Sequence, residues 1–284
     1  MLTTKQKVWL AASANRFVSI ARSALGKGNF ATVSRGGLRW RLDLNEGIDF
    51  AIYLLGAFER STVNTLGKLV NPGDVVFDIG ANIGAHTLGL ARSVGPAGRV
   101  YAFEPADFAF AKLQANLALN PELDSRTFPR QILLSATAAE PVETEIYASW
   151  PLRAANGVHP KHRGMLVTTK GAAVDTLDLF ARREGIERLN LIKMDVDGHE
   201  LPVLQGGLET LKRFRPILVM ELSPYVHRER GHDFASFVEL LHEARYSLQD
   251  AKNWRALPLD AGKLDALIPD GASINAIARP AAGK

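Results

Sequence analysis

Short apolar runs alternate with longer amphipathic stretches over most of the chain. Runs that are apolar on both faces are typical of central parallel strands, and apolar residues at helical spacing follow several of them. Strands that alternate with helices predict an α/β fold with a doubly wound, mostly parallel sheet. One helix is predicted from the stripe Leu201, Leu204, Leu208 and Leu211. The strands are expected near residues 75–79, 99–105, 132–136, 190–196 and 216–222, with closing strands, one of them antiparallel, near 246–249 and 274–278.

The first 44 residues follow a different pattern and are expected to form an extension of one helix and one strand. Residues 38–44 alternate apolar and charged positions and predict a half-exposed strand. The remaining residues, 45–284, are expected to form one domain with a small insert of short strands at about 137–173. The helix is expected to pack on that domain through one face, formed by Trp9, Ala12, Phe17, Ile20 and Ala24.

Charge separates the same two regions. Residues 1–42 contain eight Lys or Arg and no acid, whereas the rest of the chain is net −4, from 26 basic and 30 acidic residues. A basic amphipathic helix also suits peripheral contact with a membrane surface. Asn15 and Arg16 interrupt its apolar face, so neither a signal sequence nor a membrane span is expected. The chain has no cysteine, which excludes disulfides and thiolate chemistry and fits a cytoplasmic protein.

The strand at 75–79 runs into a glycine turn, Asp78-Ile79-Gly80-Ala81-Asn82-Ile83-Gly84. Ligands of open α/β sheets bind outside the carboxyl ends of the strands. The turn matches neither the phosphate loop GxxxxGK[ST] nor the dinucleotide fingerprint GxGxxG. Asp78 suits an ammonium group, and Glu104, at the next strand end, suits the cis-diol of a ribose. Together they predict S-adenosylmethionine, held by Asp78, Gly80, Asn82, Gly84, Glu104 and Ser135.

Several segments resemble the FkbM family of class I S-adenosylmethionine-dependent methyltransferases. KMDVDGHE is similar to the family's hallmark K-x-D-x-E-G-x-E, with Asp197 in place of the usual glutamate. The resemblance implies a Rossmann-like fold and O-methylation of a hydroxyl, typically on a sugar, glycolipid or polyketide-like natural product. The other matching segments, in the family's order, are NPGDVVFDIGANIGAHTL, YAFEP, NLALN, TLDLF, LIKMDVDGHELPVLQGG and PILVMEL.

Methyl transfer from a sulfonium needs alignment and exclusion of water, and a nearby base assists an aliphatic hydroxyl by about 10² to 10⁴-fold. Asp195, at the end of the fourth strand, is the first candidate for base or acceptor orientation, with helix capping as its structural alternative. Glu200 and His199 are the other catalytic candidates. No metal ligand is assigned, although Asp195, Asp197, Glu200 and Glu221 leave a divalent cation as an alternative.

Other residues carry weaker expectations about the acceptor. Lys193 is expected to pair with an acid such as Glu221 or to bind the acceptor. An acceptor-binding lid is an alternative to a solvated loop for the basic cluster His159, Lys161, His162 and Arg163. Stacking on a sugar is an alternative to core packing for the aromatic residues Phe58, Trp150, Tyr225 and Trp254.

Three functions remain open on the residues alone. The first is O-methylation of a small-molecule or glycan acceptor. The second is a nicotinamide-dependent oxidoreductase on a related sheet, which the GxNxG spacing disfavours. The third is a nucleic-acid-binding protein or RNA methyltransferase that uses the basic arm. No nucleic acid is expected as a partner, because no stripe of interleaved basic and aromatic residues is present. The pattern indicates no oligomeric state.

Overall fold

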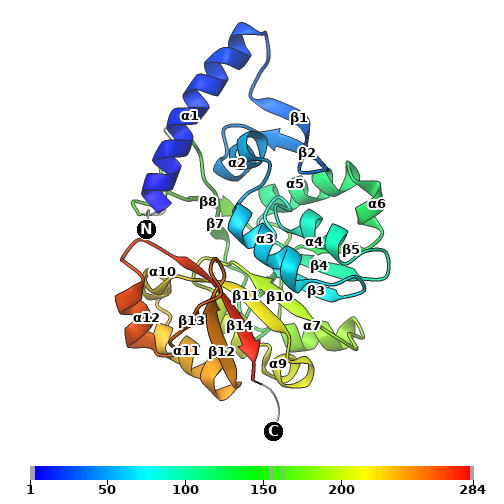
Figure 1. Cartoon of the computed structure of the whole chain (residues 1–284), viewed down its shortest axis with the longest axis vertical. Coiled ribbons are helices and arrows are strands. Elements are labelled where there is room, and N and C mark those ends of the chain that lie inside the picture. The colour runs from blue at the N-terminus through cyan, green and yellow to red at the C-terminus, as the bar shows by residue number, and fades with distance from the viewer. Residues whose placement is uncertain (1–3, 154–155, 162, 282–284) are drawn as a thin grey trace.

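The computed structural model describes residues 4–153, 156–161 and 163–281. Its main sheet has the strand order β13-β12-β14-β11-β10-β3-β4-β5 (Figure 1). The strands from β5 to β11 are parallel, and β14 runs antiparallel to both β11 and β12. This topology confirms the predicted α/β class with its antiparallel closing strand. The bounds are β3 Val75–Ile79, β4 Arg99–Phe103, β5 Thr127–Arg130, β10 Leu191–Met194, β11 Ile217–Leu222, β12 Tyr246–Asp250, β13 Ala256–Leu257 and β14 Ile274–Pro280.

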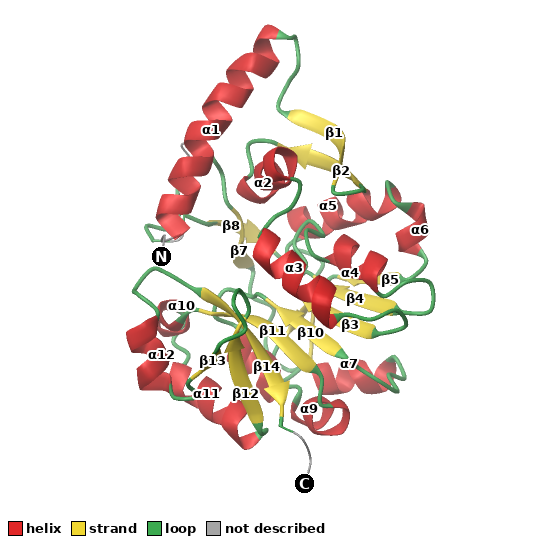
Figure 2. Cartoon of the chain, in the orientation of Figure 1, coloured by secondary structure: helices red, strands yellow, loops and turns green. Residues whose placement is uncertain are grey.

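Helices cover both faces of this sheet (Figure 2). Successive side chains of a strand point to opposite faces, so Val76 packs in one buried apolar cluster and Phe77 in the other. The first cluster includes side chains of α3 Arg60–Leu69, α4 Thr87–Ser93, α5 Asp107–Ala118 and α6 Pro121–Asp124. The second includes side chains of α7 Leu177–Arg183, α8 Glu200–Gln205, α9 Leu208–Phe214, α11 Phe234–Glu243 and α12 Ala261–Leu267. The short helix α10, Pro224–Glu229, follows β11.

Two elements differ from the sequence-based expectation. The outer parallel strand is β5, not residues 132–136; its Pro129 is compatible with an edge strand, which pairs on one side only. The expected run forms β6, Ile132–Leu134, which pairs with β9, Ala173–Asp175, in a separate small sheet. The leucine stripe at 201–211 forms two helices, α8 and α9, because Gly206 and Gly207 interrupt it.

The insert forms the two short strands that its pattern predicts. They are β7, Glu145–Ser149, and β8, Met165–Thr168, and they pair antiparallel with an irregularity between Tyr147 and Ser149. Ala148 of β7 is buried against Ala106 and Ala109 at the start of α5. The insert therefore lies beside the carboxyl end of β4.

The N-terminal extension contains a hairpin as well as a helix. The predicted strand is β2, Leu38–Asp43, and it pairs with β1, Phe30–Arg35. The other edge of β2 is bonded by side chains of the α5–α6 region: the backbone N–H groups of Arg39 and Arg41 donate to Asn120, the N-cap residue of α6, and to Asn116 of α5 at 2.9 and 2.8 Å. The hairpin is thereby fixed to the helices that cover one face of the main sheet, and α2, Gly47–Leu55, follows it.

Helix α1, Thr4–Ala24, packs through a different face from the one predicted. Trp9, Phe17 and Ile20, expected to face the domain, are 68%, 76% and 68% exposed. Asn15 is buried instead and donates from its side chain to the carbonyl of Leu44 at 2.5 Å. Small side chains let the helix approach the protein on that side, whereas an aromatic there would hold it away. No helix within the described ranges is long and apolar enough to cross a membrane.

Candidate active site

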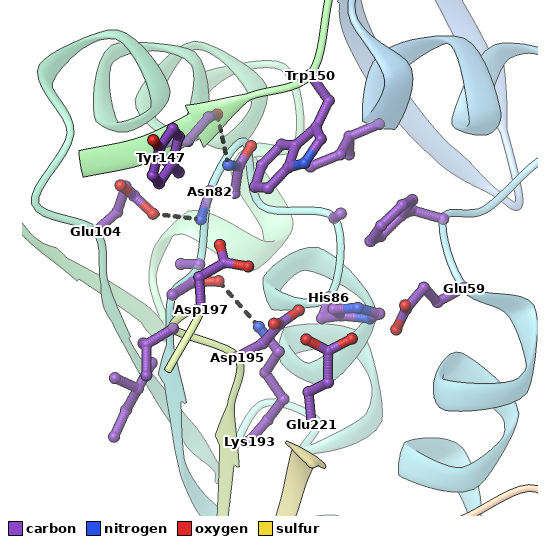
Figure 3. A pocket seen from close by; sticks show the side chains of 18 of the residues that line it. Glu59, Asn82, His86, Glu104, Tyr147, Trp150, Lys193, Asp195, Asp197 and Glu221 are labelled. Carbon is purple, nitrogen blue, oxygen red and sulfur yellow. Dashed lines mark hydrogen bonds between the residues drawn. The ribbon is translucent and has the colours of Figure 1, made fainter. Parts of the chain in front are cut away.

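A cavity of about 710 Å³ lies at the carboxyl ends of β3, β4, β10 and β11 (Figure 3). Its volume falls in the range of roughly 300–1,000 Å³ that is usual for small-molecule sites. The strand ends contribute Gly80, Glu104, Asp195 and Glu221 to its wall. Residues of α1, α2, α3, β6, β7 and α10 also line it. The cavity therefore lies where ligands bind to open α/β sheets.

The glycine turn after β3 packs directly against the end of β10. Gly80 has a φ of +76°, and a Cβ at this position would lie 1.9 Å from the carbonyl oxygen of Asp195. Gly84, with a φ of +88°, does not line the cavity; a Cβ there would lie 2.7 Å from Leu88 and 2.9 Å from Leu113. Gly80 thus lets the turn lie directly against the end of β10, and Gly84 lets the turn pack closely against α4 and α5.

Asp78 lies behind the turn, fully buried, and does not line the cavity. One of its carboxylate oxygens accepts a hydrogen bond from Thr87 at 2.6 Å, and the other lies 3.2 Å from the ammonium of Lys193. Lys193 also donates to the carbonyl of Gly80 at 2.9 Å. Burial opposes the charge on Lys193, but the Asp78 and Asp195 carboxylates outweigh it and raise its pKa. Lys193 thus pairs with an acid, as the sequence predicts, but the partner is Asp78 and not the expected example, Glu221.

Glu104 lines the cavity from the end of β4, as the sequence predicts. Its carboxylate accepts hydrogen bonds from the backbone N–H groups of Asn82 at 2.8 Å and Ala106 at 2.9 Å. Burial nevertheless raises the pKa of Glu104 to about 7. Asn82, with a φ of +48°, also donates from its side chain to the carbonyl of Ala148 in β7 (Figure 3). Asn82 therefore joins the turn, β4 and the insert at one point.

Ser135, the remaining predicted cofactor residue, is fully buried and does not line the cavity. Its hydroxyl donates to Glu140, and its backbone N–H donates to the carbonyl of Asp175 at 2.9 Å. Leu133 and Leu134, the residues just before it, line the cavity in its place. At this position the wall of the cavity is thus formed by apolar side chains.

Asp195, Glu221 and Glu59 place three carboxyl groups around one part of the cavity (Figure 3). Burial raises the pKa of Asp195, although Lys193 opposes it, and burial and neighbouring carboxylates raise the pKa of Glu221. Glu59 accepts hydrogen bonds from Thr62 and Asn275, each at 3.0 Å, and has a strained φ of +45°. No sequence motif identified Glu59, because it precedes α3 and does not follow a strand in the sequence.

Glu200 does not line the cavity. Its carboxylate lies 3.1 Å from His227, and both side chains are buried. Burial disfavours the charged form, but the adjacent His227 outweighs it and lowers the pKa of Glu200. The backbone N–H groups of Val196 and Gly198 donate to the same carboxylate at 3.4 Å each. Glu200 therefore stabilises the loop between β10 and α8.

His199 and Asp197 lie between the main cavity and a second cavity of about 670 Å³. His199 is 8% exposed and its Nδ1 lies 4.0 Å from Glu143. Burial lowers the pKa of His199 and, with the nearby Asp195 and Glu200, raises that of Asp197. The backbone of Asp197 is in the left-handed conformation, with a φ of +47°. Its carbonyl oxygen accepts a hydrogen bond from the side chain of Arg230 at 2.8 Å.

His86 is a cavity residue that the sequence marked only by its place after the turn. It is 5% exposed, and its ring nitrogens have no hydrogen-bond partner in the described part of the chain. Burial lowers its pKa to about 3, so the ring is neutral near pH 7. Its two unpaired nitrogens are therefore available to a ligand hydroxyl.

Three of the four candidate stacking residues, Phe58, Trp150 and Tyr225, line the cavity, whereas Trp254 packs beneath Lys68 and Arg279. In the basic cluster, His159 lies 3.6 Å from Glu229 and faces the second cavity; His162 lies outside the described residues.

No group of three or more His, Asp or Glu side chains within the described ranges is arranged to hold a metal ion. The main cavity thus combines an apolar wall, a Glu104 carboxylate and a cluster of acids, which suits a nucleoside at one end and hydroxyl groups at the other.

Comparisons with known proteins find related methyltransferases. Residues 78–248 match the profile of the methyltransferase FkbM domain. The hexuronic acid methyltransferase AglP of Haloferax volcanii is 28% identical over 194 residues, which cover 68% of this chain and 72% of the relative. The 31-O-demethyl-FK506 methyltransferase FkbM of Streptomyces tacrolimicus is 54% identical, with 61% of this chain and 77% of the relative covered.

A solved structure of a methyltransferase FkbM from Methylobacillus flagellatus KT aligns with 93% of this chain and 70% of that chain. The identity is 14% and the TM-score 0.43.

Proposed function

Because the chain belongs to the FkbM family of S-adenosylmethionine-dependent methyltransferases, we propose that it methylates a hydroxyl of a carbohydrate, glycolipid or other small natural product. Family membership decides against the nicotinamide-dependent alternative. One relative is named as a hexuronic acid methyltransferase, and another as a 31-O-demethyl-FK506 methyltransferase. The second name supports oxygen as the methylated atom.

The residues of the cavity fit the cofactor. S-adenosylmethionine supplies an electrophilic methyl group on a sulfonium when it is bound. Glu104 would accept hydrogen bonds from the ribose hydroxyls, and Leu133 and Leu134 would contact the apolar faces of the adenine. Gly80 lets the turn pack against the end of β10, where a side chain would collide with the carbonyl of Asp195. Asp78 would not contact the cofactor directly. It would hold Lys193, which donates a hydrogen bond to the carbonyl of Gly80 in the turn.

The observation that carries the proposed acceptor class is the group of carboxyls around Asp195. Hydroxyl groups donate hydrogen bonds, and carboxylates accept them. Six acidic and four basic residues line the cavity, and two of the four basic residues are in ion pairs, Lys193 with Asp78 and Arg230 with Glu143. The cavity therefore offers little positive charge to a polyanion such as RNA. It favours an acceptor rich in hydroxyl groups.

Asp195 is the proposed base. Burial raises the pKa of Asp195 to about 6. A general base works best when its pKa lies near the operating pH, so this shift favours catalysis near neutral pH. Glu221 and Glu59 would orient the acceptor, and the apolar lining would exclude bulk water. His199 remains a candidate acceptor contact, and Glu200 is proposed to position the loop that carries Asp195 and His199.

The test separates cofactor binding from chemistry. Calorimetry with S-adenosylhomocysteine should show binding to the native protein, and label from S-adenosylmethionine should appear on members of a panel of sugars, uronic acids and glycolipids. Asp195→Asn should keep the S-adenosylhomocysteine affinity but lose about 10² to 10⁴-fold in turnover. Asp124→Asn, an exposed acid on α6, is the matched control and should change neither. Absence of binding would defeat the cofactor assignment; full turnover in Asp195→Asn would remove that residue as base.

A further inference from the structure

One side of α1 is apolar and exposed in the described structure. The residues that form this outer face are between 50% and 76% exposed; they are Trp9, Leu10, Phe17 and Ile20. They recur at a spacing that keeps them on one side of a helix. The opposite side packs on the protein through Asn15 and Val18. The outer face therefore makes no contribution to the core.

Exposed apolar residues are concentrated in this part of the chain. Of the thirteen large apolar side chains that are exposed within the described ranges, eight lie between residues 9 and 55. Leu25 and Phe30 follow α1, and Leu54 and Leu55 end α2, which contacts α1. Figure 1 shows α1 along one edge of the molecule, away from the sheet. A gathering of exposed apolar side chains in one region marks an interaction surface.

The charge of the region selects among partners. Lys5, Arg16 and Lys27 are exposed, and residues 1–42 contain no acid to neutralise them. A second copy of the chain, bound symmetrically, would bring the same positive charge against this surface. An anionic surface would be attracted to it instead. Trp9 adds an amphipathic ring of the type that is enriched where lipid headgroups meet acyl chains.

We propose that α1 binds the surface of an anionic lipid bilayer. The helix lies in the plane of the membrane, with the outer face at the boundary between headgroups and acyl chains and Lys5 and Arg16 among the phosphates. Binding adds apolar burial to electrostatic attraction, so it weakens with salt and with loss of anionic lipid.

The same helix contributes to the cavity through other residues. Lys7, Val8 and Ala11 line the main cavity, whereas the outer face does not. A docked protein would hold this wall of its cavity close to the lipid headgroups. Substitutions on the outer face leave every residue of the proposed site in place, so binding to lipid and binding to cofactor are separable.

The experiment is co-sedimentation of the full chain with vesicles of phosphatidylcholine and phosphatidylglycerol, against vesicles of phosphatidylcholine alone. The native protein should bind the anionic vesicles, and added salt should release it. Phe17→Ser with Ile20→Ser should weaken the partition coefficient about tenfold or more, since two buried apolar side chains are lost. Lys5→Gln with Arg16→Gln should weaken it about fivefold or more. Leu179→Ser with Leu208→Ser, which removes two exposed leucines from α7 and α9, is the matched control and should bind normally.

All variants are compared by S-adenosylhomocysteine binding, which should be unchanged. The proposal is overturned if the native protein does not bind anionic vesicles, or if the outer-face variant binds them as well as the control does. A native dimer that the outer-face variant dissociates, without vesicle binding, would assign the surface to a second copy instead.

Discussion

At the scale of single residues, Glu104 gives a direct test of the cofactor site. Its pKa of about 7 means that much of the free protein carries a protonated Glu104 at neutral pH. Ribose hydroxyls donate hydrogen bonds and favour the ionised carboxylate. Affinity for S-adenosylhomocysteine should therefore fall as the pH drops below about 7, approaching about tenfold per pH unit. Calorimetry across this range measures the slope.

Glu104→Gln removes the titrating group and keeps the size of the side chain. This variant should bind more weakly near pH 8, with a flatter dependence on pH. If the native protein and the variant show the same slope, the pH dependence arises elsewhere and Glu104 does not contact the ribose.

How much of the site the sequence predicted depends on the direction in which each side chain points. Glu104 and Asp195 lie at strand ends and line the cavity, as their positions indicate. Asp78 also lies at a strand end, but its side chain points to the face covered by α4 and meets Thr87. The side chains of successive residues in a strand point to opposite faces of the sheet. Which residue reaches the ligand is thus decided by neighbours that are distant in the sequence, as with Ser135 and its partner Glu140.

At the scale of elements, the Lys193–Asp78 pair links the two central strands. The residues are Cα partners in the parallel register of β10 and β3, and both are buried. Lys193→Met would leave the carboxylate of Asp78 buried without its counter-ion, so we expect a loss of about 3–5 kcal/mol in the free energy of unfolding. Urea denaturation measures this loss.

The double variant Lys193→Met with Asp78→Asn removes both charges and should be more stable than Lys193→Met alone. Lys263→Met, at an exposed position of α12, should cost less than about 0.5 kcal/mol. If the double variant were no more stable than the single one, the charge of Asp78 would not be the cause of the loss.

The elements that the sequence predicted are those whose pattern is purely local. The runs of β3, β4, β10 and β11 are apolar on both faces, and they form central strands. β5 was missed because TFPR has no such run; an edge strand needs fewer apolar residues. The packed side of α1 was predicted wrongly because hydrophobicity alone selected Trp9 and Phe17, whereas the contact surface selected small side chains and Asn15.

At the scale of the whole molecule, the acids of the cavity couple stability to pH. Four of them have raised pKa values in the folded protein: Glu104, Asp195, Asp197 and Glu221. An acid with a raised pKa keeps its proton in the folded state at a pH where the unfolded chain has released it. The folded state then holds more protons, so its stability falls as the pH rises.

Three histidines have the opposite effect in a lower pH window. The pKa values of His86, His199 and His232 are lowered, so the unfolded chain binds their protons first and stability rises with pH up to about 6.5. Above that pH they are neutral in both states, and the acids alone determine the slope.

We therefore expect the free energy of unfolding to decrease between about pH 7 and pH 8.5, by about 1.4 kcal/mol per pH unit for each proton that the folded state retains. Urea denaturation at several pH values measures this slope. Asp197→Asn should reduce it, because the burial of Asp197 near Asp195 and Glu200 raises its pKa. Asp124→Asn, an exposed site, should leave the slope unchanged. Stability that is constant or increasing across this window in the native protein would show that the cavity acids are already ionised at neutral pH, and the proposed general-base role of Asp195 would then rest on geometry alone.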